Sequence, residues 1–307
     1  MYTIASGANH GLRYVKEATP GVTPASPVMI ELAHTGCSLG LTRDTFTSNA
    51  LRSDRQIPFN RTGVDKVGGN IDFEFGAVEY DPLLEAALGG NWTENVLKVG
   101  TAEHSFTFER AFKNINEYAS YTGCFIDQFT LSIKPNAMLT GSFSVVGLSG
   151  ARGGNPLSAS PKPSQDPVPF DSFKGALKLD GQEIAVVTGI DLTLANGVEP
   201  QYGIFSRSAS AVSLGRSTLS GTLSAFYTDG NLADDFINDA RVKLEFTLQR
   251  GDYSYTFLIP NVTFTGAEDS VQSEGPISLN VPWSAALDAT LGTNFQITRT
   301  VPADPIV

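Results

Sequence analysis

Residues 71–75 read Ile-Asp-Phe-Glu-Phe, and residues 242–249 read Val-Lys-Leu-Glu-Phe-Thr-Leu-Gln. Both stretches alternate apolar and polar residues, which places the apolar side chains on one face of a β-strand and the polar ones on the other. Strands with one buried and one solvated face are typical of antiparallel sheets, so these stretches predict a mostly β protein. The same alternation recurs at residues 129–133, 190–194, 219–223 and 277–281.

Two short segments have helical signals instead. In residues 81–88, Asp81 can cap a helix, Pro82 suits its first turn, and Gly89 can end it. A second helix is predicted over about residues 232–240, where apolar residues recur at helical spacing. We expect each helix to cover one open face of a β-sandwich.

The two halves of the chain carry the same parts in the same order. Residues 35–39 correspond to residues 188–192, and residues 69–73 to residues 221–225. The offsets are nearly equal, 188 − 35 = 153 and 221 − 69 = 152. Chance similarity of two strand-rich stretches is the alternative, because Ser, Thr and Gly are common in any β protein, but duplication explains the equal offsets better.

Duplication predicts two tandem antiparallel β-sandwich or barrel domains, each with a short flanking α-helix. The segment between them is dense in Pro, Gly and Ser, as linkers are. The predicted division is an N-terminal arm at 1–34, a first β domain at 35–150, a linker at 151–172, a second β domain at 173–296 and a C-terminal tail at 297–307.

The chain is acidic, with a formal net charge of −11 over 307 residues. A protein that grips nucleic acid through its phosphates is usually basic, so we expect any contact with DNA to be weak. No apolar run approaches the roughly 20 residues that span a bilayer, and we expect no membrane anchor. The two cysteines, Cys37 and Cys124, lie among apolar residues and are predicted to be buried thiols.

The sequence offers little catalytic chemistry. Of the three histidines, His10 falls in an N-terminal segment expected to be mobile, and His34 and His104 flank strands without a nearby Glu or Cys at metal-ligand spacing. Asp72 and Glu74 share a strand face, which suggests a glycosidase pair or a calcium site, but a solvated sheet face explains them more simply. We predict that the protein is not an enzyme and has no cofactor or metal.

Three stretches resemble a known family. They are Tyr-Val-Lys-Glu-Ala-Thr-Pro-Gly at 14–21, Leu-Thr-Arg-Asp at 41–44 followed by Asn-Ala-Leu-Arg-Ser-Asp-Arg-Gln at 49–56, and the segment from Leu-Asp-Gly at 179–181 to Asn-Gly at 196–197. They are similar to segments of the major tail tube proteins of long-tailed, siphovirus-type bacteriophages, and the resemblance covers most of residues 12–290. Residues 197–216 depart from it, because they lack the charged set of Arg52, Asp54 and Arg55.

The resemblance implies a structural virion protein with two tail-tube-like β domains, assembled in the host cytoplasm into stacked rings. The rings form a hollow tail tube through which genomic DNA leaves the capsid. Six copies of the fold per ring are usual in the family, so a chain with two copies predicts a trimer with pseudo-sixfold symmetry, and a hexamer of whole chains is the alternative. The implied partners are further copies of the chain, the tape-measure protein, and the tail tip and tail terminator or connector proteins, while duplex DNA passes without tight binding.

Two groups of residues are candidates for these contacts. An acidic lining repels DNA, so we expect polar strand faces to line the lumen, with Asp72, Glu74, Ser220, Thr222 and Ser224 as candidates. Residues 42–66 form a longer charged connection than a hairpin needs, and we expect it to reach the next ring. The inter-ring candidates are Arg43, Arg52, Asp54, Arg55 and Arg61, for which an intramolecular surface cluster is the alternative.

A capsid decoration protein or another β-sandwich surface or binding protein is the alternative function, since a sandwich fold permits either. A carbohydrate-binding module is expected to show clustered exposed aromatic residues. Trp92 and Trp283 are isolated in the sequence, and Tyr253 with Tyr255 is the one close pair. Core or interface packing explains these aromatic residues as well as binding does.

Overall fold

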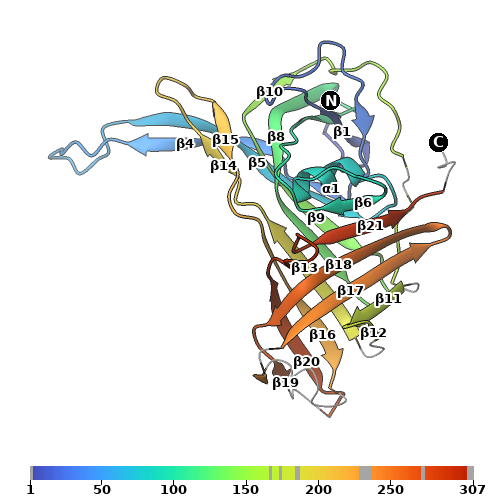
Figure 1. Ribbon diagram of the computed structural model, residues 1–307. Helices are drawn as coiled ribbons and strands as arrows, with labels where there is room; N and C mark the ends of the chain where they lie inside the picture. The colour runs from blue at the N-terminus through green and yellow to red at the C-terminus, as the bar shows by residue number, and fades with distance from the viewer. Residues whose placement is uncertain are drawn as a thin grey trace.

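The computed structural model is mostly β, with antiparallel sheets and, within the described residues, one α-helix (Figure 1). It describes residues 3–165, 168–172, 175–183, 187–227, 237–238, 240–270 and 274–302. The first half contains the strands β1 (His10–Lys16), β2 (Ile30–Glu31), β3 (Gly36–Cys37), β4 (Gly40–Thr47), β5 (Asn60–Glu74), β6 (Val96–Lys98), β7 (Phe106–Phe112), β8 (Glu117–Ile133), β9 (Thr140–Gly147) and β10 (Ser149–Gly153), with the 3-10 turn η1 (Gly7–Asn9) and the helix α1 (Asp81–Leu88).

The second half contains β11 (Gly175–Leu179), β12 (Gln182–Glu183), β13 (Val187–Ala195), β14 (Glu199–Gln201), β15 (Ala211–Ser213), β16 (Thr218–Phe226), β17 (Arg241–Arg250), β18 (Tyr253–Phe264), β19 (Glu268–Ser270), β20 (Ser278–Ala285) and β21 (Gln296–Thr300). Each stretch whose alternation predicted a strand lies in one of these elements, apart from a residue or two at the ends.

The two halves repeat one order of strand pairing. In the first half the order is β1, β7, β8, β9, β5 and then β3 with β4. In the second half it is β11, β17, β18, β20, β16 and β13. The residue register also repeats, because Cys37 pairs with Ile71 as Ile190 pairs with Leu223. These are the positions that the equal sequence offsets made equivalent.

The repetition extends to irregularities in the strands. The ladder of β7 with β8 shifts register between Phe106 and Phe108, and that of β17 with β18 shifts between Val242 and Leu244. Residues of β8 and β9 map onto the second half with one constant offset, 264 − 126 = 138 and 281 − 143 = 138. Bulges fix strand register and bend, so a shared bulge is a more specific likeness than shared alternation.

The halves join into one continuous sheet. Residues 128–133 of β8 pair with residues 190–195 of β13, which links the order β3/β4, β5, β9, β8 to the order β13, β16, β20. A second layer packs on one face of this sheet, and β17 and β18 cross in front of β13 and β16 in Figure 1. The core lies between the layers and includes Phe73, Phe143, Leu192, Leu223 and Trp283, each at most 2% exposed.

Two equivalent glycines let the strands of this sheet approach closely. Gly69 has φ +147°, and a Cβ there would lie 2.6 Å from the backbone of Leu39. A Cβ at Gly221, its counterpart, would collide with the carbonyl oxygen of Asp191 and with the Trp283 ring. A larger residue at either position would push apart neighbouring strands, which explains why both halves have glycine there.

The ends and the segment between the halves are more ordered than the sequence predicted. His10 begins β1, which pairs along its whole length with β7, so it does not lie in a mobile segment. In the Pro-rich segment, β10 pairs with β8 and Phe170 is fully buried. Residues 296–300 form β21, which pairs with β18 and β6. The domain boundaries themselves stay a prediction.

The helix α1 has the predicted bounds and ends in left-handed Gly89, with φ 61°. Asp81 does not cap it, because the N-cap residue is Tyr80 and Asp81 is buried in the first turn. The apolar face of α1 packs into the core through Leu83, Leu84 and other residues. Most of the second predicted helix, over residues 232–240, lies outside the described residues.

Candidate functional site: a polar sheet face and two projecting connections

The continuous sheet has one polar face that runs through both halves. Along a single cross-strand row, Asp72 pairs with Ser142, which pairs with Thr130, then Thr193, Ser220 and Ser284. The next row contains Glu74, Thr140, Ser132, Asp191, Thr222 and Pro282. Four of the five candidate lumen residues lie in these two rows, and Ser224, two residues beyond Thr222 on β16, faces the same side. All five therefore lie on one face of the same sheet, although they come from different halves.

This face has acidic residues but no basic ones in those rows. Asp72, Glu74 and Asp191 are exposed, while the hydroxyl residues are exposed or half-buried. The Ser132 hydroxyl donates to Asp191 Oδ1 at 2.5 Å, and the Ser224 hydroxyl donates to Asn280 Oδ1 at 2.8 Å. Short hydroxyl side chains that bond across strands leave a smooth, negatively charged surface with few protruding groups.

The sheet ends in two edges that the described residues leave unpaired. At one end β3 and β4 pair with β5 alone. At the other end β19 pairs with β20 alone. Unpaired strand edges are templates for pairing with another chain, so this polar sheet is open to extension at both ends.

The connection over residues 42–66 is mainly a β-hairpin and not an irregular loop. β4 pairs with the first part of β5 as far as Thr47 and Asn60, and only residues 48–59 lie between them. The hairpin projects away from the body (Figure 1). Large apolar side chains are exposed on it, namely Phe46, Leu51, Ile57 and Phe59, each at least 60% exposed. We call residues 43–65 the arm.

Three of the charged candidates on the arm, Arg43, Arg52 and Asp54, form ion pairs within the chain. Arg43 Nε lies 2.5 Å from Asp65 Oδ1, and its guanidinium lowers the pKa of that carboxyl. Arg52 binds Asp54 at 2.5 Å and lowers its pKa likewise. The structure thus gives Arg43, Arg52 and Asp54 the intramolecular contacts that were the alternative interpretation. Arg55 and Arg61 form no ion pair with any described residue.

The equivalent connection in the second half, residues 196–217, folds back along the arm. It forms the hairpin of β14 with β15, which lies beside the arm's base in Figure 1. The Tyr202 hydroxyl donates to Asp65 O at 3.1 Å, and Asp65 N donates to Arg207 O at 2.8 Å. Arg207 Nη2 also donates to Thr62 Oγ1 at 3.1 Å. We call residues 196–217 the brace.

A buried polar cluster fastens the halves together. Asp81 of α1 accepts a hydrogen bond from the Tyr255 hydroxyl at 2.8 Å and forms an ion pair with Arg299. The Arg299 guanidinium lies 4.3 Å from the centre of the Trp92 ring. Burial raises the pKa of Asp81 to about 6, although Arg299 and Tyr255 act in the opposite direction. Trp92 and Tyr255 thus serve packing, as does Trp283.

His10 and His34 form a hydrogen-bonded chain that needs both rings neutral. Arg110 Nε donates to His10 Nε2 at 3.1 Å, so His10 carries its proton on Nδ1 and donates to His34 Nε2 at 2.8 Å. His34 Nδ1 then donates to Leu32 O at 3.1 Å. Burial, with help from His34 and Arg110, lowers the pKa of His10 to about 4. His104 is buried and bonded to Gly90 O.

Sequence reasoning missed the role of Glu17, in the first of the three resembling stretches. Its buried carboxylate accepts four hydrogen bonds, from Gly21 N, Ser105 Oγ, Thr107 Oγ1 and Gly123 N, at 2.7 to 3.0 Å. A buried carboxylate is tolerated when such donors surround it. Glu17 therefore ties the turn after β1 to β7 and β8, and it is structural.

Other chemistry is sparse within the described part of the chain. It contains no group of three or more His, Cys, Asp or Glu residues arranged to hold a metal ion. Cys124 is buried as predicted, whereas Cys37 is only half-buried, and both are free thiols. None of the described helices has the length and apolar character that crossing a bilayer requires.

Comparison with known proteins gives one family. A family model described as "Phage tail tube protein" matches residues 7–285. The match spans both halves, the polar sheet face, the arm and the brace. The search of curated proteins found no match.

Proposed function

Because the chain belongs to the phage tail tube protein family, a structural component of the virion tail, we propose that it assembles by itself into stacked trimeric rings. Those rings form the hollow tube that conducts genomic DNA to the host. The observation that carries this proposal is the single sheet with a polar face and two unpaired edges. The match to a tail tube family favours it over a capsid decoration or binding protein.

The polar face is the part of the molecule suited to line the lumen. Its opposite face is covered by the second layer and forms the core, so only the polar face remains free. Acidic residues there repel DNA phosphates and let a duplex slide without binding tightly. A density map of the assembled tube with Asp72 and Glu74 on the outer wall would refute this assignment.

The junction of the halves within one chain is the template for the junction between chains. Residues 130–132 of β8 pair with residues 191–193 of β13, and the offset of 138 makes residues 268–270 of β19 the counterparts of residues 130–132. The counterpart of β13 is β3 with β4. The β19 edge of one copy therefore pairs with the β3/β4 edge of the next, with Ser270 opposite Ser38 as Ser132 is opposite Asp191.

Strand number favours three chains per ring. Each chain supplies eight strand positions, β3/β4, β5, β9, β8, β13, β16, β20 and β19, and 8 × 3 = 24. Strands about 4.8 Å apart and tilted by about 40° give a barrel roughly 45–50 Å across between backbones. Such a barrel admits duplex DNA with room for side chains, whereas six chains would double the diameter.

The arm is suited to reach a neighbouring ring. It projects from the body, the brace is hydrogen-bonded to its base, and large apolar side chains are exposed on it. Arg55 and Arg61, which form no ion pair with a described residue, add positive charge. Burial of such a patch against another ring would stabilise stacking mainly by the hydrophobic effect, with the charges giving orientation. The tape-measure, tip and terminator proteins are the further partners we propose at the lumen and the tube ends.

A designed disulfide tests the ring directly. In the double variant Ser38→Cys, Ser270→Cys, oxidation of the concentrated protein should link each chain to the next, because the two Cα positions are directly opposite. We expect a covalent, cyclic trimer on a denaturing gel, and rings with a central channel by negative-stain electron microscopy. The single variants are controls, and Thr42→Cys with Ser270→Cys is a matched pair four residues out of register.

Each outcome bears on the proposal. A cyclic hexamer would support the pairing of the β19 edge with the β3/β4 edge and would show that the ring contains six chains and not three. Efficient linkage of the mismatched pair, or monomers without rings at high concentration, would overturn self-assembly through these edges.

A further inference from the structure

The edge strand of the first half is interrupted where its counterpart in the second half is regular. β13 pairs with β16 without a break over residues 189–195. In the first half the ladder with β5 stops after Cys37 and resumes at Gly40, although the register is the same on both sides of the gap. Ser38 and Leu39 therefore leave the regular ladder, at an edge that the described residues leave unpaired.

A side chain replaces a backbone group in this gap. In an antiparallel ladder a hydrogen-bonded pair of residues exchanges two backbone bonds. Ser38 N donates to Asn70 O at 2.9 Å, but Asn70 N donates to the Ser38 hydroxyl at 2.8 Å. Gly69, opposite Leu39, has φ +147°, whereas the equivalent Gly221 has no positive φ. The edge is thus kinked at a place where glycine permits the kink.

Side chains of the same chain engage both backbone groups of Leu39. Arg110 Nη1 donates to Leu39 O at 2.6 Å, and Arg110 Nε donates to His10 Nε2 at 3.1 Å. Burial raises the pKa of the Cys37 thiol, and the Leu39 amide beside the sulfur acts in the opposite direction. The Leu39 carbonyl is therefore occupied by a guanidinium, and its amide lies next to a sulfur.

The equivalent carbonyl in the second half has a strand as its partner. Hydrogen-bonded pairs alternate along an antiparallel ladder, and the bond from Asn196 N to Asp127 O shows which residues of β13 bond to β8. Leu192, four residues earlier, faces Leu131 in the same kind of pair. Leu192 is the counterpart of Leu39. At a paired edge the Leu39 carbonyl would therefore accept from the neighbouring strand.

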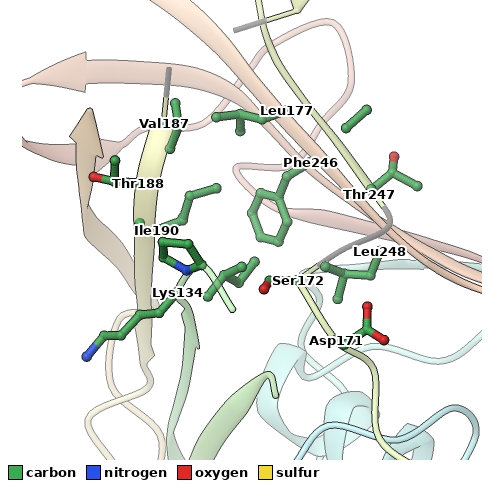
Figure 2. A pocket seen from close by; sticks show the side chains of 15 residues that line it. Lys134, Asp171, Ser172, Leu177, Val187, Thr188, Ile190, Phe246, Thr247 and Leu248 are labelled. Atoms are coloured by element: carbon green, nitrogen blue, oxygen red, sulfur yellow. The ribbon is translucent and has the colours of Figure 1, made fainter. Parts of the chain in front are cut away.

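The residue that occupies this carbonyl is different in the second half. Arg110 pairs with Ala119 as Phe246 pairs with Phe257, so Phe246 is the counterpart of Arg110. Phe246 lines a pocket of about 310 Å³ beside the start of β13, and Figure 2 shows its ring in the middle of that pocket. A phenylalanine ring cannot donate to a carbonyl. The donor is thus found at the edge without a strand partner and is replaced at the edge that has one.

We propose that Arg110 blocks the β3/β4 edge in the unassembled chain by holding the Leu39 carbonyl, and releases it when the next copy pairs there. The inference rests on the proposed ring, whose register places the backbone amide of Asp269 opposite Leu39. A kinked edge with an occupied acceptor is a poor template for indiscriminate pairing. The correct partner offers a full row of backbone hydrogen bonds, which outweighs one contact with Arg110. The block costs some ring stability and disfavours wrong partners.

Removal of the donor tests the block. Arg110→Met keeps most of the side-chain length and should lower the protein concentration for half-assembly into rings by at least about threefold, because no hydrogen bond from a charged donor has to be given up. Arg152→Met is the matched control, since it removes the same charge from an exposed position on β10. It should change that concentration less than about twofold. Sedimentation measures the ring fraction, and thermal unfolding of the monomer checks the fold.

A second variant removes the kink without changing Arg110. Ser38→Ala deletes the hydroxyl that accepts from Asn70 N, so that amide can pair with the carbonyl of residue 38, and assembly should again need less protein. Parent-like or weaker assembly of both variants, with rings formed by the parent, would overturn the block and leave the ring standing. If the parent forms neither rings nor the cysteine link between positions 38 and 270, the proposed function fails.

A density map of the assembled ring gives the direct test. The ladder of β3/β4 with β5 should be continuous through Ser38 and Leu39, as the ladder of β13 with β16 is. The Leu39 carbonyl should accept from the next copy, with the Arg110 guanidinium moved away. A ring in which Arg110 still donates to Leu39 O and the kink persists would overturn the proposal.

Discussion

The arm and the brace are equivalent connections of the repeated fold, yet they differ in length, in direction and in what they contact. Residues 43–65 contain the projecting hairpin of β4 with β5, and residues 196–217 join β13 to β16, at the same register position in each half. The arm is a long hairpin that projects from the body, whereas the brace contains a shorter hairpin that turns back and donates hydrogen bonds to the arm's base. Large apolar side chains are exposed on both, including Ile204 and Phe205 of the brace.

The difference teaches that a repeated scaffold need not repeat its surface. Strand pairing in the two halves is held by the same register, bulges and glycines, which packing strongly restricts. Connections lie outside the core and are free to diverge. One half has therefore kept a projecting element, and the other half supports it, so a pseudo-sixfold ring would carry three arms and not six.

The largest effect is expected from removing the arm. Replacement of residues 48–59 by Asn-Gly joins Thr47 to Asn60, which are already paired, through a two-residue hairpin turn. We expect intact rings, an unchanged monomer fold and loss of stacked tubes, since the apolar tip is gone. Electron microscopy counts rings and tubes.

The brace offers the matched control for this truncation. Replacement of residues 202–210 by Asn-Gly joins the paired residues Gln201 and Ala211 and should shorten tubes without abolishing them. Tubes of normal length after arm removal would contradict the role of the arm. Arg55→Glu is the single-residue form of the test, and unchanged tube length and stability would count against an ionic contact there.

A medium effect is expected from pH on the free energy of unfolding, to which Asp81 and His10 contribute with opposite signs. Asp81 has a pKa raised to about 6, so the folded protein binds more protons there than the unfolded chain, and its contribution to stability is lost as pH rises from about 4 to 6. The shift corresponds to about 3 kcal/mol. His10 has a pKa lowered to about 4, so its contribution increases with pH between about 4 and 6.5.

Two variants separate these opposing contributions to the pH dependence of the free energy of unfolding. Relative to the parent, Asp81→Asn should make the free energy of unfolding increase more with pH between 4 and 6, and His10→Gln should make it increase less. Urea unfolding at several pH values measures both. Equal slopes in the parent and Asp81→Asn would show that Asp81 titrates alike in the folded and unfolded chain.

The smallest effect is expected where the brace meets the arm. Tyr202→Phe removes one half-buried hydrogen bond to Asp65 O, which contributes about 0.5–1.5 kcal/mol locally. Hydrogen exchange at the Asp65 amide, which donates to Arg207 O, should accelerate. Exchange in the central strand β16 should stay the same, and equal exchange at Asp65 would show that the brace does not stiffen the arm.

Much of the sheet was readable because alternation and repeat offsets are local or periodic signals. Residues 71–75 and 242–249 lie on strands with the predicted faces, and α1 has its predicted bounds. The role of Asp81 was not readable, because its partners Tyr255 and Arg299 are more than 170 residues away. The order of the segments near the two ends of the chain was not predictable from the sequence either, because β1 and β21 pair with strands that are distant in the sequence.

The sequence by itself determined the β class, the tail tube resemblance and which residues face away from the core, because a period of two assigns every strand residue to one of two faces. Only the tertiary structure decided that Asp72 and Glu74 share a face with Ser220 and Thr222, and that Arg110 donates to the carbonyl of Leu39. Those relations depend on which strands pair across the halves, and pairing at long range is fixed by packing of the whole core.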